Sequence, residues 1–173
     1  MWLLAISLDI HKPSSSRIMR QYAVIVNLES EKSDRYTMSS LPLHLTILSI
    51  FFSDKPPSFF TTQVIDIADD TRQFNIKTTG RALFGINEDI SVTLVKKNDE
   101  LRKLHLRLLD AVSDHVSFRA PQFLGDGYGP HITDQGDREA PGDGDLLVGK
   151  LMLVEIIDQD VLVRSDHILS SAT

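Results

Sequence analysis

The segment Leu41-Pro42-Leu43-His44-Leu45-Thr46-Ile47-Leu48 is apolar at every odd-numbered position up to residue 47, whereas Pro42, His44 and Thr46 occupy the even-numbered positions. Successive side chains of a strand point to opposite faces, so this alternation predicts a β-strand with its leucine face toward the core. The other face then presents His44 and Thr46 together, about 6.6 Å apart along the strand.

The sequence on either side of this strand predicts a mixture of strands and helices. A helix is expected from Thr61-Thr62 to about Gln73, and a second from Asn98 or Asp99 to near Phe118, with leucines at three- and four-residue steps. Helices that follow pairs of strands are typical of the α+β class. Further strands are expected at residues 21–28, 74–84, 90–97, 146–157 and 161–164, with an acidic Gly/Pro loop at 134–145.

The chain has 173 residues, which suits one domain that buries roughly two-thirds of its unfolded surface. We expect residues 19–173 to form a single domain of two lobes and residues 1–18 to be an N-terminal extension. The longest apolar runs are shorter than the roughly 20 residues that a membrane-spanning helix needs. A cytoplasmic monomer without a membrane partner is therefore expected.

Composition limits the chemistry and the partners. The absence of cysteine excludes disulfides, thiolate zinc sites and a cysteine nucleophile. A net charge of −6 disfavours long duplex nucleic acid, so a small nucleotide or an RNA end is the expected partner. Basic residues near the binding cleft would overturn that preference, and Arg81, Lys96 and Lys97 are the candidates.

Three of the six histidines are followed by an apolar residue and then a hydroxyl: His44-Leu45-Thr46, His115-Val116-Ser117 and His131-Ile132-Thr133. Residue 115 falls at the end of the second predicted helix, where positions i and i+2 diverge by about 200°, so that copy is interpreted as a decoy. The other two copies lie in predicted strands about half a chain length apart. This spacing is expected if two similar lobes each supply one His-x-Thr strand to a shared cleft.

The segments 41–48 and Tyr128-Gly129-Pro130-His131-Ile132-Thr133 resemble the paired motifs of the two-histidine (2H) phosphoesterase superfamily, in particular its 2'-5' RNA ligase-like and cyclic phosphodiesterase branch. The resemblance covers roughly residues 22–164. It implies a bilobal, pseudo-symmetric α+β fold with two antiparallel sheets flanking a central cleft and helices outside. It also implies that His44 and His131 are catalytic and that Thr46 and Thr133 bind phosphate.

The chemistry implied by this resemblance needs neither a cofactor nor a metal site. One neutral and one protonated imidazole supply the base and the acid that open a 2',3'-cyclic phosphate, because histidine titrates near neutrality. We therefore expect a phosphodiesterase acting on 2',3'-cyclic phosphate ends or a related small cyclic nucleotide. The same geometry run backwards would give a 2'-5' RNA ligase activity.

Several alternatives remain open from the residues alone. The same chemistry could cleave linear 2'-5' linkages or a cyclic phosphate on ADP-ribose. A non-catalytic nucleotide- or RNA-binding module that keeps the cleft is the main alternative of another class. A zinc hydrolase using both histidines is a third, although the sequence has no H-E-x-x-H motif and no cysteine ligands.

Residues around the motifs suggest how a substrate could be held. Tyr128 and Phe51 are candidates for stacking a nucleobase, although core packing is an ordinary role for Phe51. Arg138 could reach a phosphate or be a solvated charge among acidic neighbours, and His105 is expected to be structural. Residues 134–137 are polar where the family continues its strand with apolar residues, a departure that bears on substrate preference more than on the chemistry.

Overall fold

The computed structural model describes residues 18–30 and 32–171. The helices in this range are α1 (Pro57–Asp69) and α2 (Asp99–Val112). The strands are β1 (Arg20–Asn27), β2 (Arg35–Thr37), β3 (His44–Ser53), β4 (Phe74–Phe84), β5 (Ile90–Val95), β6 (Ser117–Phe118), β7 (His131–Thr133), β8 (Asp143–Val148), β9 (Lys150–Ile157) and β10 (Asp160–Ile168).

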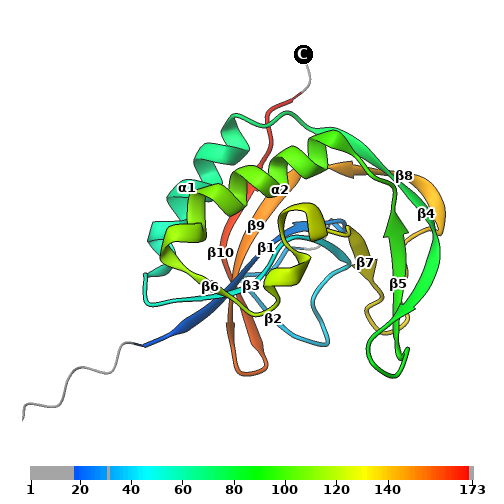
Figure 1. Cartoon of the computed structure of the whole chain (residues 1–173), viewed down its shortest axis with the longest axis horizontal. Helices are drawn as coiled ribbons and strands as arrows, with labels where there is room; N and C mark the ends of the chain where they lie inside the picture. Colours follow the sequence, from blue (N-terminus) through cyan, green and yellow to red (C-terminus); the bar gives the residue numbers. More distant parts are fainter. Residues whose placement is uncertain (1–17, 31, 172–173) are drawn as a thin grey trace, which may run out of the picture.

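The described strands form one ten-stranded sheet in the order β2-β10-β9-β1-β3-β7-β5-β4-β8, with β6 also paired to β3. Every strand pair is antiparallel. The sheet has two halves, with β4, β5 and β8 together on one side of the molecule and β1, β9 and β10 on the other (Figure 1). One residue pair between β3 and β7 joins the halves. The predicted α+β class is confirmed, and the two antiparallel sheets that were expected are the two halves of one continuous sheet.

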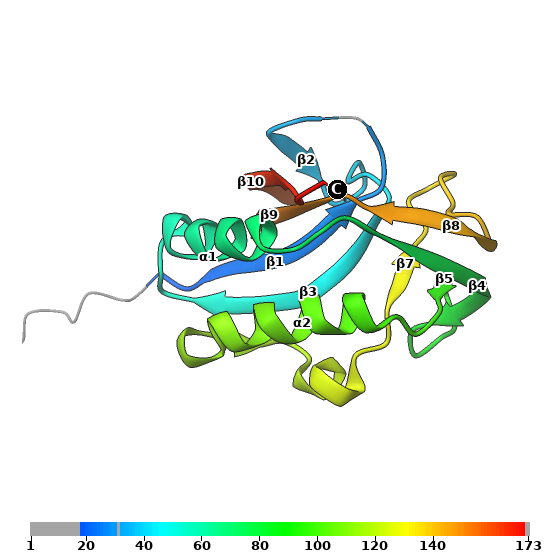
Figure 2. The same ribbon diagram turned by 90° about the horizontal axis from the view of Figure 1, so that it is seen from above.

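The main core lies between the helices and one face of the sheet. Apolar side chains of α1 and α2 pack there against buried residues of β1 and β3, and Figure 2 shows α2 running alongside β3. A smaller buried cluster, which includes Ile25 and Val154, covers the opposite face of β1 and β9. No helix within the described range is long and apolar enough to cross a bilayer.

The first helix begins earlier than the sequence pattern predicts. It starts at Pro57 and ends at Asp69, so the predicted start at Thr61 and end near Gln73 were wrong. A proline pair is typical of a loop, but proline is also tolerated in the first helical turn, where its missing N–H group has no intrahelical partner. The early start buries Phe60 in the core.

The second helix begins where the sequence predicts. The side chain of Asn98 caps it by accepting a hydrogen bond from the Leu101 N–H group at 2.9 Å. The helix ends at Val112, however, and a 3-10 turn (Ser113–His115) leads directly into β6. The predicted end near Phe118 was therefore wrong, because these last residues pair with β3 instead.

The predicted strand at 146–157 is two strands in the structure. The chain leaves β8 at Val148 and enters β9 at Lys150, and the two strands belong to different halves because β8 pairs with β4 and β9 with β1. Strand β8 also begins at Asp143, inside the predicted acidic loop. The predicted N-terminal extension lies outside the described residues, apart from Ile18.

Candidate active site

The two His-x-Thr motifs meet where the halves of the sheet join. Leu45 of β3 is paired with Ile132 of β7 in antiparallel register, so the middle residues of the two motifs face each other. Both of these side chains are fully buried in the main core. The residues that flank them must therefore point to the opposite face of the sheet.

The antiparallel register fixes which motif residues are neighbours. Counting outward from the central pair places His44 opposite Thr133, and Thr46 opposite His131. Directly opposed residues have Cβ atoms about 4.5–5.5 Å apart, and diagonal ones such as the two histidines about 7–8 Å. This spacing leaves room for one phosphate between the imidazoles.

Both imidazoles are held in the same way. The Nδ1 atom of His44 lies 2.8 Å from the Pro42 carbonyl oxygen, and that of His131 lies 2.9 Å from the Gly129 carbonyl oxygen. A carbonyl oxygen can only accept, so each Nδ1 carries a hydrogen and donates it. In the neutral ring the Nε2 lone pair is then free for proton transfer.

A cavity of about 280 Å³ is lined by three of the four His and Thr residues of the motifs, namely His44, Thr46 and His131. Thr133 lies two residues beyond His131 on the same face of β7, outside the lining of this cavity. Within the described part of the chain, neither threonine hydroxyl has a hydrogen-bond partner. Both hydroxyls are therefore available to a ligand.

The surroundings of His44 favour its neutral form. Burial lowers the pKa of His44 below its ordinary value of 6.5, and the nearby His131 lowers it further. The hydrogen bond to the Pro42 carbonyl and the charge of Glu29 act in the opposite direction and are outweighed. At neutral pH His44 is therefore placed to accept a proton.

A hydrogen-bond network behind the sheet supports this strand. The Nδ1 atom of His105, in α2, donates to the Ile47 carbonyl oxygen at 2.7 Å, and its Nε2 accepts from the Gly125 N–H group at 2.9 Å. Tyr128 stacks on His105 with ring centroids 4.1 Å apart, and its hydroxyl donates to the Thr46 carbonyl oxygen at 3.0 Å. His105 is thus structural, as predicted, and ties the first motif to the loop before the second.

The family model of the 2'-5' RNA ligase superfamily matches residues 14–150, which include both motifs. This chain belongs to the 2'-5' RNA ligase superfamily. The resemblance to this superfamily seen in the sequence is thereby confirmed. No curated protein matches the sequence significantly.

Solved structures share the fold of this superfamily member at low sequence identity. TT0787 of Thermus thermophilus is 17% identical, and the match covers 88% of this chain and 100% of that one with a TM-score of 0.56. Escherichia coli LigT complexed with 3'-AMP is 11% identical over 88% of this chain and 99% of that one, with a TM-score of 0.57. A structure described as a phosphoesterase is 13% identical over 87% and 99%, with a TM-score of 0.56.

The two candidate stacking residues lie outside the cavity that contains the histidines. Phe51 is fully buried in an aromatic cluster with Tyr22 and Phe60, which leaves no ring face for a nucleobase, so its interpretation as a stacking residue was wrong. Tyr128 is on the helix side of the sheet, where it lines a separate cavity with Lys97. Tyr128 therefore lies on the helix side of the first motif, and His44 and His131 line a cavity on the opposite face of the sheet.

One aromatic side chain beside the site was not found from the sequence. Phe84, at the end of β4, packs edge-on against the His131 ring with centroids 4.9 Å apart, and 39% of its surface remains exposed. Phe84 and Ile90 are paired in the β4–β5 hairpin, and the long-range pairing of β5 with β7 brings this hairpin beside His131. Its position suits an aromatic platform next to the second motif.

Arg138 has a role that the sequence did not indicate. Its guanidinium donates to the Glu29 carboxylate at 2.8 Å and to the Leu41 carbonyl oxygen at 2.9 Å. These contacts tie the loop after the second motif to the segment before the first. Arg138 thus joins the two halves instead of being free in solvent.

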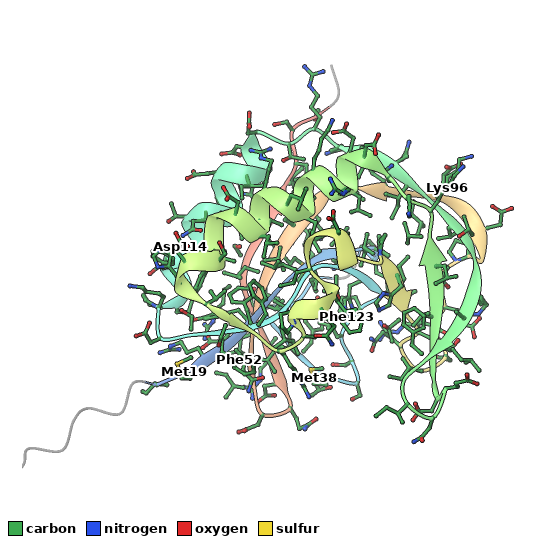
Figure 3. The ribbon with its side chains drawn as sticks, in the orientation of Figure 1. Met19, Met38, Phe52, Lys96, Asp114 and Phe123 are labelled. Carbon is green, nitrogen blue, oxygen red and sulfur yellow. The ribbon has the colours of Figure 1, made fainter. Side chains whose placement is uncertain are left out.

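The three basic residues considered from the sequence lie away from the histidines. Arg81 is paired with the carboxylates of Asp134 and Glu139. Lys96 is exposed just beyond the end of β5, at the outer edge of the view in Figure 3, and Lys97 lines the cavity next to Tyr128. None of the three lines the cavity of His44 and His131 in the described structure. Within residues 18–30 and 32–171 there is also no cluster of three potential metal ligands.

Proposed function

We propose that this protein is a metal-independent phosphodiesterase that hydrolyses 2',3'-cyclic phosphate ends or a related small cyclic nucleotide. The pairing of Leu45 with Ile132 carries the proposal, because this register makes His44 and His131 diagonal neighbours on one face of the sheet, with a threonine opposite each of them. Membership of the 2'-5' RNA ligase superfamily supports the same chemistry.

The lowered pKa of His44 suggests how the two proton transfers are divided between the imidazoles. Burial keeps His44 neutral, so its Nε2 atom takes the proton of the attacking water. His131 then donates the proton of its own Nε2 to the ribose oxygen that leaves phosphorus. One P–O bond forms, one breaks, and the product is a phosphate monoester. A ribose hydroxyl in place of the water would follow the same path: His44 removes its proton, the ribose oxygen leaves phosphorus with a proton from His131, and a phosphodiester joins the two ends.

The hydroxyls and the motif geometry supply the remaining stabilisation. Thr46 and Thr133 would donate hydrogen bonds to the non-bridging phosphate oxygens, where negative charge increases in the transition state. Each hydroxyl is on the strand opposite the histidine that it faces, so the phosphate would be held from both halves of the sheet. This placement orients the reacting bond between the two imidazoles.

Turnover of 2',3'-cyclic nucleotides in the presence of EDTA tests the proposal directly. We expect the wild-type protein to release a nucleoside monophosphate at an unchanged rate when EDTA is present, because imidazoles perform both proton transfers. The assay separates product by chromatography and includes 2'-5' dinucleotides as parallel substrates. Complete loss of turnover in EDTA, restored by added zinc, would instead support a metal hydrolase.

The pH profile of the reaction should reflect the lowered pKa of His44. A base is active only when neutral, so lowering its pKa extends activity to more acidic solutions. We expect kcat/KM for a cyclic nucleotide to follow a bell-shaped profile whose acid limb lies below pH 6.5. Measurements between pH 4.5 and 9 check this. An acid limb above pH 6.5, or a flat profile, would contradict the assignment of His44 as the base.

A further inference from the structure

Strand β3 contains a β-bulge immediately after Thr46. Thr46 is paired with one residue of β1 and Leu48 with the next, so Ile47 is an extra residue in β3. The side chains of Ile47 and Leu48 are consecutive, yet both are fully buried in the main core. A bulge bends its strand and changes the direction of the side chains beside it. The direction of the Thr46 hydroxyl therefore depends on the shape of this bulge.

Two side chains bind the backbone of the bulge from the helix side of the sheet. The Tyr128 hydroxyl donates to the Thr46 carbonyl oxygen at 3.0 Å, and the His105 Nδ1 atom donates to the Ile47 carbonyl oxygen at 2.7 Å. The two rings are stacked, with centroids 4.1 Å apart and an interplanar angle of 3°. Helix α2, which carries His105, runs alongside β3 (Figure 2). One stacked pair of rings therefore holds two successive carbonyl groups of the bulge.

Tyr128 also belongs to the segment that orients the second histidine. The carbonyl oxygen of Gly129, the next residue, accepts the hydrogen bond from the His131 Nδ1 atom. In the register of the two motifs, Thr46 is the residue opposite His131. The Tyr128 hydroxyl thus connects, on the helix side, the two residues that face each other on the cavity side.

The Tyr128 hydroxyl is a permanent donor that does not contact the catalytic cavity. Burial raises the pKa of this hydroxyl above its ordinary value of 10.0, so the group stays protonated at neutral pH. Tyr128 lines the cavity on the helix side and not the one lined by His44 and His131. Any effect of its hydroxyl on the reaction must therefore pass through the strand that it holds.

We propose that Tyr128 is a positioning residue for the reaction, and that its hydroxyl fixes the bulge so that the Thr46 hydroxyl points at the phosphate. His105 is the second part of the same support, because its ring stacks on Tyr128 and its Nδ1 atom holds the next carbonyl group. The inference rests on the proposed phosphodiesterase function, in which Thr46 donates to a non-bridging oxygen. A misplacement of about 1 Å in such a site can lower the rate by about 10²-fold.

Tyr128→Phe removes only the hydroxyl, and Tyr22→Phe is its matched control. The Tyr22 ring is buried in the main core, and its hydroxyl donates to the Lys55 carbonyl oxygen at 2.9 Å, away from both motifs. Each variant thus loses one hydrogen bond from a phenol to a backbone carbonyl. A general effect of that loss on the fold should lower the melting temperature of both variants.

The kinetic constants for adenosine 2',3'-cyclic phosphate distinguish the two variants. We expect kcat to fall at least tenfold in Tyr128→Phe, and KM to change less than threefold, because no contact with the substrate is lost. Tyr22→Phe should retain the wild-type kcat. A wild-type kcat in Tyr128→Phe, or an equal loss in both variants, would overturn the proposal.

Thr46→Val tests whether Tyr128 acts through the Thr46 hydroxyl. Valine keeps the branched shape of threonine and removes the hydroxyl. When Tyr128→Phe is added to Thr46→Val, kcat should fall by less than twofold further, because two residues that act through one contact give non-additive losses. Losses that multiply in the double variant would overturn the proposal.

Two substitutions of His105 test the contact with the bulge. The amide nitrogen of asparagine falls near the position of Nδ1, so His105→Asn can still donate to the Ile47 carbonyl oxygen. The longer glutamine places its amide near the position of Nε2, beside Gly125. Both variants lose the ring that stacks on Tyr128, so we expect kcat to be at least threefold higher in His105→Asn than in His105→Gln. Equal values or the reverse order would overturn the role of His105, and this pair decides the proposal if Tyr128→Phe does not fold.

The same assays separate this inference from the proposed function. If the wild type turns over no cyclic nucleotide, the proposed function has failed and the positioning role falls with it. If turnover is present and depends on His131, but Tyr128→Phe equals the wild type, only the positioning role is refuted.

Discussion

Replacement of His44 or His131 by alanine is expected to lower kcat for a 2',3'-cyclic nucleotide by about 10²–10⁴-fold each. Each imidazole transfers a proton to or from an oxygen bound to phosphorus, and water cannot take over either role at a fixed position. KM should change far less, because the threonine hydroxyls proposed to bind the phosphate remain. Initial rates at saturating substrate, with binding measured separately by calorimetry, check this prediction.

The decoy motif provides a matched control for the histidine variants. His115 belongs to the third His-x-hydroxyl tripeptide, but it lies exposed in a 3-10 turn with its ring against Phe59. We expect His115→Ala to retain wild-type turnover. Equal activity of all three alanine variants would rule out the catalytic assignment, and binding by an inactive wild type would point to a nucleotide-binding module.

Phe51→Ala is expected to lower the free energy of unfolding by about 3–5 kcal/mol, as is typical when a large aromatic is removed from a core. The Phe51 ring is fully buried, with its centroid 5.2 Å from that of Phe60 and 6.0 Å from that of Phe118. A domain is stable by only about 5–15 kcal/mol, so much of that stability should be lost. Urea unfolding followed by circular dichroism measures the change.

The exposed Phe123 offers the comparison for this variant. Its side chain is 59% exposed, so Phe123→Ala should change stability by no more than about 0.5 kcal/mol. If Phe51→Ala unfolds at the wild-type urea concentration but has a raised KM, the ring contacts substrate. That outcome would restore the interpretation of Phe51 as a stacking residue.

The local sequence pattern predicted the elements that are determined by residues close together in the chain, namely the strand around His44 and the start of α2. The period-two alternation identified the strand from His44 onward and the face that presents the histidine, because one-sided burial requires it. The prediction was wrong for Leu41, which precedes the strand and packs in the smaller cluster on the other face. The leucine spacing and Asn98 likewise located the start of α2. The pattern failed at Pro57, where proline is compatible with either a loop or a first helical turn.

The pairing between strands that are distant in the chain could not be predicted from the local pattern. The register of Leu45 with Ile132 depends on the closure of a loop of about half the chain, and no local pattern specifies it. The same is true of Phe84 beside His131 and of the Arg138 contacts with the first half. The division of one predicted strand at Gly149 is also visible only when both partner strands are known.

The opposed register of the two motifs has a consequence for regiochemistry. A centre in which each imidazole faces the other strand's threonine is nearly unchanged when the ring phosphate is turned end for end. Such a centre alone cannot decide whether the 2' or the 3' oxygen departs. That decision depends on an asymmetry in the surroundings of the two histidines, and in this molecule the partly exposed Phe84 ring packs against the imidazole of His131. We therefore expect the position of the base, and not the residues that transfer protons, to decide which isomer of the product forms.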